Sequence, residues 1–149
     1  MKRGFTLIEL MIVIAVMAIL IGIALPQFRG MQEEGLIAQA KAELRTLKTA
    51  IESYYIHNGS YPADSDTWQA TNLINASPII VRVALIDPFS PAITPAEYQL
   101  VYSPSFKYYA IYSVGTTGTA TVTVSDLGAV TESPETCIYV SNGEEDTTP

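Results

Sequence analysis

Residues 1–28 read MKRGFTLIELMIVIAVMAILIGIALPQF, and this stretch decides the fold. Between residues 5 and 25 its only strongly polar side chains are those of Thr6 and Glu9. A helix of about 20 apolar residues spans the hydrocarbon core of a bilayer, so the stretch predicts a membrane-spanning helix. Two basic residues precede it, and the positive-inside rule then predicts a cytoplasmic N-terminus with the rest of the chain outside the cytoplasm.

Three interpretations of this segment compete. A secretory signal peptide has a shorter apolar run and a small-x-small cleavage site after it, and IALPQ is a poor match to such a site. A plain membrane anchor explains the hydrophobicity but leaves Glu9 as a cost of about 2–3 kcal/mol. The third interpretation is that another chain supplies a partner for the Glu9 carboxylate.

The third interpretation is also what a family resemblance implies. RGFTLIELMIVIAVMAILIGIALPQF (residues 3–28) resembles the signature of class III prepilins, the superfamily of type IV pilins and type II secretion pseudopilins. The resemblance implies cleavage between Gly4 and Phe5 by a prepilin peptidase and N-methylation of Phe5. Pro26 stands where the family usually has a proline, and the family uses the position of Glu9 in assembly.

The implied role of Glu9 is physically sound. Cleavage creates an ammonium group at Phe5, one helical turn from the carboxylate. In the family the carboxylate meets the N-terminal amine of a neighbouring subunit, which offsets the cost of placing either charge in hydrocarbon. The implied partners are further copies in a helical filament, the inner membrane, the prepilin peptidase, an assembly platform and minor pilins or pseudopilins.

The pattern predicts four consecutive segments. Residues 1–4 are a leader peptide, 5–28 a transmembrane and filament-core helix, 29–58 an amphipathic helix, and 59–149 an antiparallel β domain with an acidic tail. We therefore expect an α+β fold of the pilin type, in which a long N-terminal helix packs on a small antiparallel sheet.

The second half of the helix carries one apolar stripe. Its members recur at spacings of three and four, which is typical of a helix that buries one face: Ile37, Ala40, Leu44, Leu47, Ile51 and Tyr54. We favour packing on the chain's own sheet over a coiled coil, because the stripe is short and strand-like sequence follows. The helix should stop at His57-Asn58-Gly59. Gly22, Pro26 and Gly30 mark the segment expected to kink or melt.

Beyond the helix the sequence predicts strands with tight turns between them. Short β-branched or aromatic runs stand at 79–86, 98–102, 107–114, 120–125 and 137–140. Residues 98–125 should form an antiparallel meander that turns at 103–105 and 115–118. One short helical turn is expected at 68–73.

The region from Asp87 to Gly118 resembles major pseudopilins of type II secretion, in which an Asp-Pro-aromatic turn leads into a hairpin and a glycine-rich loop. That loop usually binds calcium through several aspartates, but this chain has Asp126 alone there. Asp126, Glu132 and Asp146 are the calcium candidates, and otherwise we expect no cofactor. The lone Cys137 rules out the disulfide that closes many type IV pilins.

The composition of the chain argues against several other classes of function. The net charge is −7 and no Lys or Arg follows Lys107, which argues against nucleic acid as a partner. We expect His57 to interact with the dipole at a helix C-terminus and Cys137 to be a small buried residue. We therefore expect that the chain is not an enzyme. The tyrosines at 98–112 should pack on the sheet, with a sugar-binding or electron-carrying face as the alternative.

The sequence thus predicts a structural subunit that polymerises into a type II secretion pseudopilus. The alternative is a type IV pilus subunit for adhesion, motility or DNA uptake. In either case the precursor sits in the bacterial inner membrane with its domain outside the cytoplasm, and the product is a periplasmic or extracellular filament.

Overall fold

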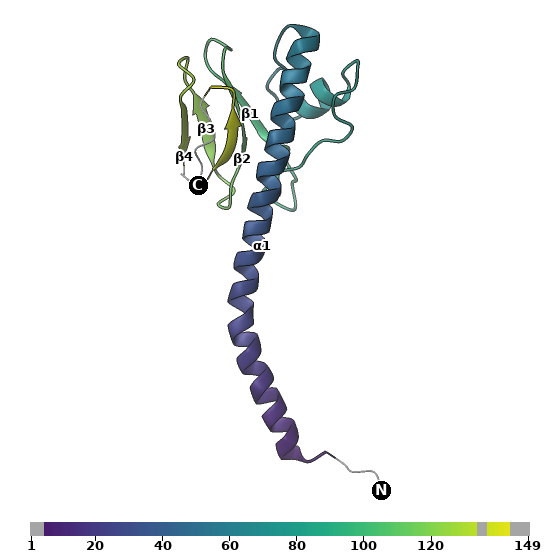
Figure 1. The fold of residues 1–149 in the computed structure, drawn as a ribbon, viewed down its shortest axis with the longest axis vertical. Helices are drawn as coiled ribbons and strands as arrows, with labels where there is room; N and C mark the ends of the chain where they lie inside the picture. Colours follow the sequence, from purple (N-terminus) through teal and green to yellow (C-terminus); the bar gives the residue numbers. More distant parts are fainter. Residues whose placement is uncertain (1–4, 134–136, 144–149) are drawn as a thin grey trace. The chain divides into compact units, whose positions relative to one another are not determined.

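The computed structural model describes residues 5–133 and 137–143. The chain forms two compact units, residues 1–35 and residues 36–149. Helix α1 (Leu7–Asn58) supplies almost all of the described part of the first unit and the first element of the second (Figure 1). Pro26 lies inside α1 without interrupting its helical assignment.

The helix ends where the sequence predicts. The Gly59 N–H donates to the carbonyl of Tyr55 at 2.8 Å, and Gly59 takes a left-handed φ of +72°. The Asn58 side chain caps the carbonyl of Tyr54 at 3.0 Å. A left-handed glycine just beyond the last turn satisfies carbonyls that the helix leaves open, so this stop signal is confirmed.

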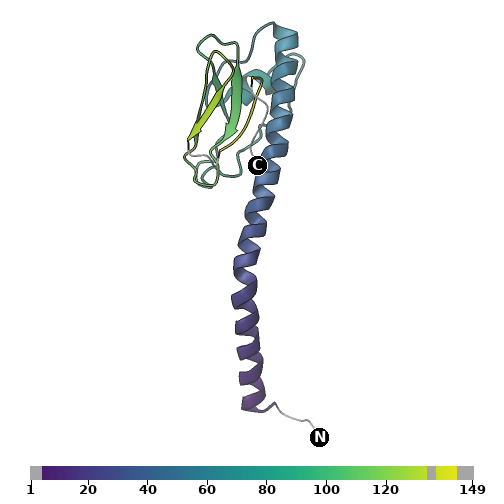
Figure 2. The same cartoon turned by 60° about the vertical axis from the view of Figure 1, so that its left-hand side comes forward.

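In the second unit the predicted stripe of α1 packs on the chain's own sheet. Leu44, Leu47 and Ile51 are fully buried, and they share one core with Tyr98 and Ile111. Figure 2 shows the strands along one side of the later part of α1. The expectation of an α+β fold is confirmed, and sheet packing rather than a coiled coil accounts for the stripe.

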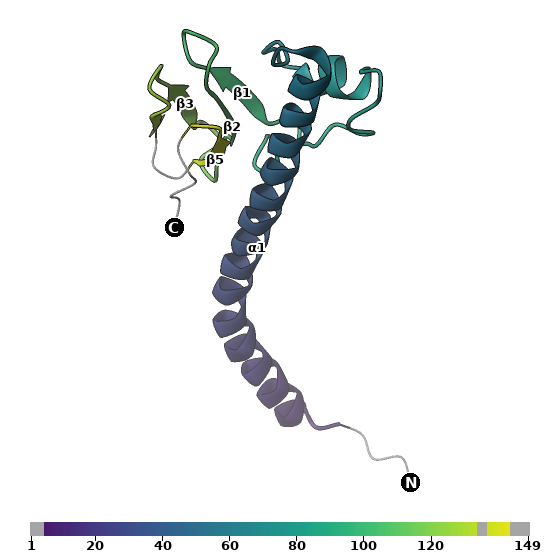
Figure 3. The same ribbon diagram turned by 45° about the horizontal axis from the view of Figure 1, so that its top comes forward.

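Within residues 5–133 and 137–143, five strands form two antiparallel sheets (Figure 3). The first sheet has the order β1-β2-β5, built from β1 (Gln99–Tyr102), β2 (Tyr109–Ser113) and β5 (Ile138–Ser141). The second pairs β3 (Thr121–Val124) with β4 (Val130–Ser133). Ile111 faces Leu100 on one side and Val140 on the other, which fixes β2 at the centre of the first sheet.

The predicted meander is only partly correct. The turns at 103–106 and 115–118 are present, as the hydrogen bonds from Phe106 N to Ser103 O and from Gly118 N to Gly115 O show. However, β3 does not continue the first sheet, because β5 from the end of the chain occupies the free edge of β2. β3 instead pairs with β4, a strand that the sequence analysis did not predict.

The predicted strand at 79–86 is wrong. The segment is irregular and carries only an isolated bridge from Ile86 to Glu97. The backbone groups of Ile80, Val81 and Leu85 bond instead to the π-helical turn η1 (Gln69–Ile74). Gln69 pairs its side-chain amide with both backbone groups of Leu85, at 2.8 and 3.0 Å, and so takes the place of a neighbouring strand.

Candidate assembly site

The N-terminus of α1 is held by a reciprocal pair of side chains. The Glu9 Oε2 atom accepts hydrogen bonds from the Thr6 backbone N–H at 2.8 Å and from the Thr6 hydroxyl at 2.7 Å. In return the Thr6 Oγ1 atom accepts from the Glu9 N–H at 3.3 Å. Thr6 immediately precedes the first helical residue, so this is a capping box in which two otherwise open helix-end donors are satisfied.

The capping box revises the interpretation of Glu9. The sequence analysis assigned the carboxylate wholly to a second subunit and overlooked the T-x-x-E pattern of residues 6–9, which predicts the box. Both contacts of the carboxylate use Oε2. Within the described part of the chain Oε1 accepts no hydrogen bond, so one oxygen remains available to a cation.

The apolar side chains around this site all face outward in the single chain. Phe5 is 85% exposed, Leu7 77% and Ile8 66%, and large apolar side chains stay exposed through Met31. Among the described residues, α1 is the one helix long and apolar enough to cross a membrane, judged by length and composition. So large an exposed apolar surface requires either lipid or other protein around it. Gly4, the predicted leader end, lies outside the described residues.

A buried carboxylate, that of Asp87, organises two loops of the second unit. Asp87 is only 2% exposed. Its Oδ1 accepts from the Phe89 N–H at 2.9 Å and the Ser113 hydroxyl at 2.8 Å, and its Oδ2 accepts from the Val114 N–H at 2.7 Å. Three donors therefore compensate the burial of the charge, and they tie the Asp-Pro-Phe turn to the end of β2.

The calcium candidates do not form a cluster in the described part of the chain. Asp126 instead accepts a hydrogen bond from the Ser105 N–H at 2.8 Å, and its hydrogen bonds to Ser105 hold the pKa of the exposed Asp126 carboxyl below its usual value. No three metal-ligating side chains come together among residues 5–133 and 137–143. Asp146 lies outside the described residues.

The surroundings of Cys137 and His57 are those of residues with a structural role. Cys137 is 2% exposed, its thiol donates to the Ser113 carbonyl at 3.4 Å, and burial raises its pKa to about 12. A thiol in that state is a poor nucleophile at neutral pH. His57 is exposed in the last turn of α1, with Nδ1 2.8 Å from the Ser53 carbonyl, as expected of a helix C-terminal partner.

Tyr98 and Tyr109 are fully buried in the core that the first sheet shares with α1, and this contact with the helix goes beyond the predicted packing on the sheet. The Tyr98 hydroxyl donates to Glu43 Oε2 at 2.7 Å and the Tyr109 hydroxyl donates to Glu52 Oε1 at 2.6 Å. Burial raises the pKa of both phenols. The sequence analysis did not predict partners for Glu43 and Glu52 of α1. The structure gives them partners that link α1 to the sheet.

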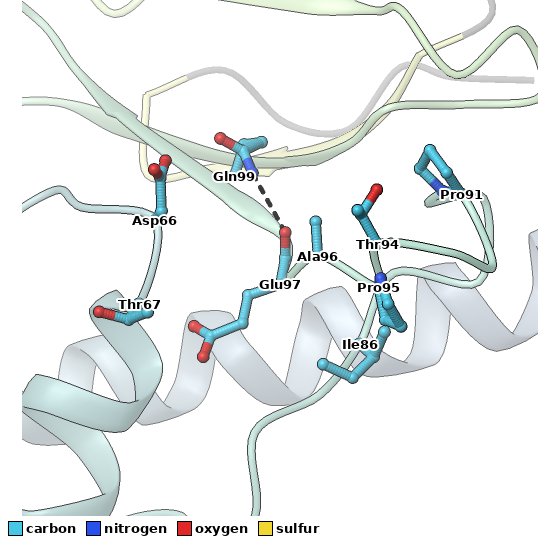
Figure 4. Close-up of a pocket in the computed structure, with 9 residues that line it drawn as sticks. All are labelled: Asp66, Thr67, Ile86, Pro91, Thr94, Pro95, Ala96, Glu97 and Gln99. Carbon is cyan, nitrogen blue, oxygen red and sulfur yellow. Dashed lines mark hydrogen bonds between the residues drawn. The ribbon is translucent and has the colours of Figure 1, made fainter.

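A surface pocket of about 520 Å³ lies beside the start of β1 (Figure 4). Glu97 is its central carboxylate, and it accepts from the Gln69 N–H at 3.1 Å at the beginning of η1. Partial burial raises the pKa of Glu97. The Gln99 amide donates to the Glu97 carbonyl at 3.2 Å. The carboxylate of Glu97 therefore has a structural role, because it satisfies an N–H group at the start of η1.

Comparison with known families covers both halves of the chain. Residues 1–25 match the prokaryotic N-terminal methylation motif, and residues 27–129 match type II secretion system protein G. No solved structure matches.

Curated relatives match over part of the chain. The type IV major pilin protein PilE of Neisseria gonorrhoeae is 38% identical over 65 residues, which cover 44% of this chain and 39% of the relative. The type IV major fimbrial protein FimA of Dichelobacter nodosus is 35% identical over 77 residues, 52% of this chain and 48% of FimA. The fimbrial protein EcpB of Eikenella corrodens is 48% identical over 58 residues, 39% of this chain and 36% of EcpB.

The match thus spans less than half the length of these relatives. The protein G match, in contrast, extends over more than half of this chain and includes the Asp87 turn and strands β1, β2 and β3. The chain therefore belongs to the type II secretion system protein G family and carries the prokaryotic N-terminal methylation motif in front of it.

Proposed function

We propose that the chain is a structural subunit, not an enzyme, that polymerises into the pseudopilus of a type II secretion system. The main support for this proposal is the arrangement of side chains at the N-terminus of α1. A carboxylate that caps its own helix, with one oxygen open, stands in the first turn of α1, and the large apolar side chains of α1 from Leu7 to Met31 are exposed. Such a helix needs neighbours, and such a carboxylate needs a cation once it leaves water.

The proposed pathway begins in the inner membrane, with the N-terminus in the cytoplasm and the domain outside it. A prepilin peptidase hydrolyses the Gly4–Phe5 bond, and the new Phe5 amine is methylated. An assembly platform then adds the subunit to a filament that minor pseudopilins help to start. In that filament Glu9 Oε2 still caps its own helix while Oε1 meets the Phe5 ammonium of a neighbouring copy.

Two observations bear on which filament is formed. The protein G match favours the pseudopilus, whereas the relatives named above are called type IV pilins or fimbrial proteins. The alternative is therefore a type IV pilus subunit. Deletion of the gene separates the two, since loss of a secreted protein supports the pseudopilus and loss of surface fibres or of twitching supports the pilus.

The test of the assembly role is Glu9→Gln. Glutamine at this position still completes a capping box, so the helix end stays intact while the charge is removed. Losing one partner of a buried ion pair costs about 3–5 kcal/mol, which weakens subunit docking by about two to four orders of magnitude. We expect the variant to be inserted and cleaved but to yield few or no filaments.

The measurement is an immunoblot of membrane and sheared-filament fractions, with mass spectrometry of the N-terminus to verify cleavage. Thr6→Ser is the matched control, because it keeps the capping hydroxyl and the Glu9 charge and should assemble normally. Wild-type filament yield from Glu9→Gln would refute the assembly role of the carboxylate.

A further inference from the structure

A second pocket lies between the end of α1 and the turn that joins β1 to β2. It has a volume of about 400 Å³, within the range of small-molecule sites. Its lining residues carry three aromatic rings, three hydroxyl groups and one ammonium group: Tyr55, Gly59, Ser60, Tyr61, Phe106 and Lys107. This pocket plays no part in the proposed filament contact at Glu9.

The backbone at Phe106 is the first sign that the pocket has a use. Phe106 has a φ of +56°, in the left-handed region that residues with a Cβ adopt at a cost. Among the residues that the structure describes, every other residue with positive φ is a glycine. A turn that glycine would make without strain therefore holds an aromatic ring instead, and strain of this kind gathers at functional positions.

Burial does not explain the choice of phenylalanine, since Phe106 is 65% exposed. One face of its ring stacks on Tyr102, with centroids 5.4 Å apart and planes 29° from parallel. The stack orients the ring beside the pocket and leaves most of the side chain open to solvent.

The rings beneath the pocket are held in place by hydrogen bonds. The Tyr102 hydroxyl donates to the Pro62 carbonyl at 2.6 Å, and the Tyr109 hydroxyl is bound to Glu52. Tyr61 packs on these rings, with centroids 5.1 Å from Tyr109 and 4.6 Å from Tyr55. A ligand would meet surfaces that are already ordered, which lowers the entropic cost of binding.

The charge of the pocket is unusual for this chain. After Lys48 the sequence holds only two basic residues, Arg82 and Lys107, against eleven acidic ones. Lys107 lines the pocket, and its ammonium lies 5.1 Å from the centroid of the Tyr108 ring. A cation placed beside aromatic faces and hydroxyl groups suits a ligand with an anionic group, apolar C–H faces and hydroxyls of its own.

We propose that this aromatic pocket binds an acidic saccharide, such as a uronic acid unit of a polysaccharide. The pyranose C–H face would lie on Phe106 and Tyr55, and the carboxylate would pair with Lys107. Hydroxyl groups of the sugar would exchange hydrogen bonds with Ser60 and the tyrosine hydroxyls.

The experiment is saturation-transfer NMR on the full chain in a detergent without a sugar headgroup. Trigalacturonate is the acidic probe and cellotriose is the neutral probe. We expect saturation of the trigalacturonate ring protons by the wild type and a weaker response from cellotriose. The absence of transfer to trigalacturonate would overturn the proposal, and equal transfer to both sugars would overturn the assignment of an acidic ligand.

Two variants test the site directly. Phe106→Gly relaxes the left-handed turn and so keeps the fold, yet it should weaken trigalacturonate binding at least tenfold. Lys107→Gln should reduce the preference for the acidic probe. Ile93→Ala is the control, because Ile93 is 95% exposed and lies outside the pocket, and it should bind as the wild type does.

Unchanged binding by Phe106→Gly would refute the site. Loss of concentration-dependent self-association in Phe106→Gly, with sugar binding unchanged, would show that a second copy occupies the pocket instead. Neither result depends on whether the chain assembles through Glu9, so this proposal and the proposed function can fail separately.

Discussion

At the scale of single residues, Asp87 shows how this fold accommodates a buried carboxylate. It is a buried carboxylate whose two oxygens accept three hydrogen bonds from the turn at Phe89 and the end of β2. A charge so placed stabilises the fold only while all of its donors remain. The aspartate of the Asp-Pro-Phe turn is thus a structural tie between two loops.

We expect Asp87→Asn to destabilise the second unit by about 2–4 kcal/mol. The amide removes the charge and turns an N–H group toward one of the three donors, which leaves a buried N–H without an acceptor. Trp68 reports the transition, because it is the only tryptophan and is 1% exposed. Urea unfolding followed by its fluorescence measures the change.

The control for this prediction is Asp64→Asn, since Asp64 is exposed. Its unfolding midpoint should match the wild type within about 0.5 kcal/mol. Equal midpoints for all three proteins would show that the Asp87 tie does not stabilise the fold.

Glu9 shows how far a single residue can be predicted. Its place in an apolar run indicated a partner, and the family resemblance supplied one in another chain. The capping contact to Thr6 was equally accessible, because Thr, two further residues and Glu form a known helix-start pattern. Because a charge is rare in an apolar run, the interpretation of Glu9 considered a partner in another chain and missed Thr6, which is the nearest one.

At the scale of elements, α1 was predictable and the sheets were predictable only in part. The stripe on α1 and its stop at Asn58 depend on local spacing and on one glycine. Strands β1, β2, β3 and β5 fall within two residues of the predicted runs. Their pairing could not be predicted, because β5 reaches β2 from far along the chain and displaces β3.

The prediction of a strand at 79–86 was wrong for a physical reason. Its apolar, β-branched composition is typical of a strand, but composition does not identify the hydrogen-bond partner. The partners are the Leu73 carbonyl, which accepts from Ile80 and Val81, and the side chain of Gln69. A side chain that acts as a strand edge leaves no signal in hydrophobic periodicity.

Gln69 is fully buried, and its side chain bonds both backbone groups of Leu85 in place of a neighbouring strand. This contact leads to a prediction. Gln69→Met keeps the size of the side chain and removes both hydrogen bonds, so the N–H and carbonyl of Leu85 lose their partners. We expect a loss of about 2–5 kcal/mol in the free energy of unfolding. Trp68 fluorescence in urea again measures it.

Gln39→Met is the matched control, because Gln39 is exposed and bonds only to Glu43 on the same helix. That variant should unfold close to the wild type. If Gln69→Met were as stable as Gln39→Met, the amide contact would not be what holds the segment out of a sheet.

At the scale of the whole molecule, the buried tyrosines predict instability in alkali. Burial, together with the carboxylates Glu43 and Glu52, raises the pKa of Tyr98 and Tyr109 above the ordinary value of 10.0. The unfolded chain therefore releases these protons first as the pH rises. Stability is fully present below about pH 10 and falls above it, by about 1.4 kcal/mol per pH unit for each phenol.

Urea midpoints between about pH 8 and pH 11 test this prediction. Tyr98→Phe removes one titrating group and should flatten the slope, at the expense of the bond to Glu43. Tyr55→Phe is the control, since Tyr55 is 43% exposed and should leave the slope unchanged. A midpoint independent of pH across this range would contradict the prediction.

The last prediction concerns the independence of the second unit. Removing residues 1–31 eliminates the exposed apolar run of the first unit and keeps the α1 stripe that enters the core. The remaining unit has its own core around Leu44, Trp68 and Ile111, and none of the described residues of the deleted segment belongs to that core. We therefore expect a soluble, cooperatively folding protein with mixed helix and strand content, measured by circular dichroism. Sedimentation should show a monomer, because the surface that required lipid or neighbours is gone. Aggregation at all concentrations, or a purely helical spectrum, would mean that the core needs the membrane segment after all.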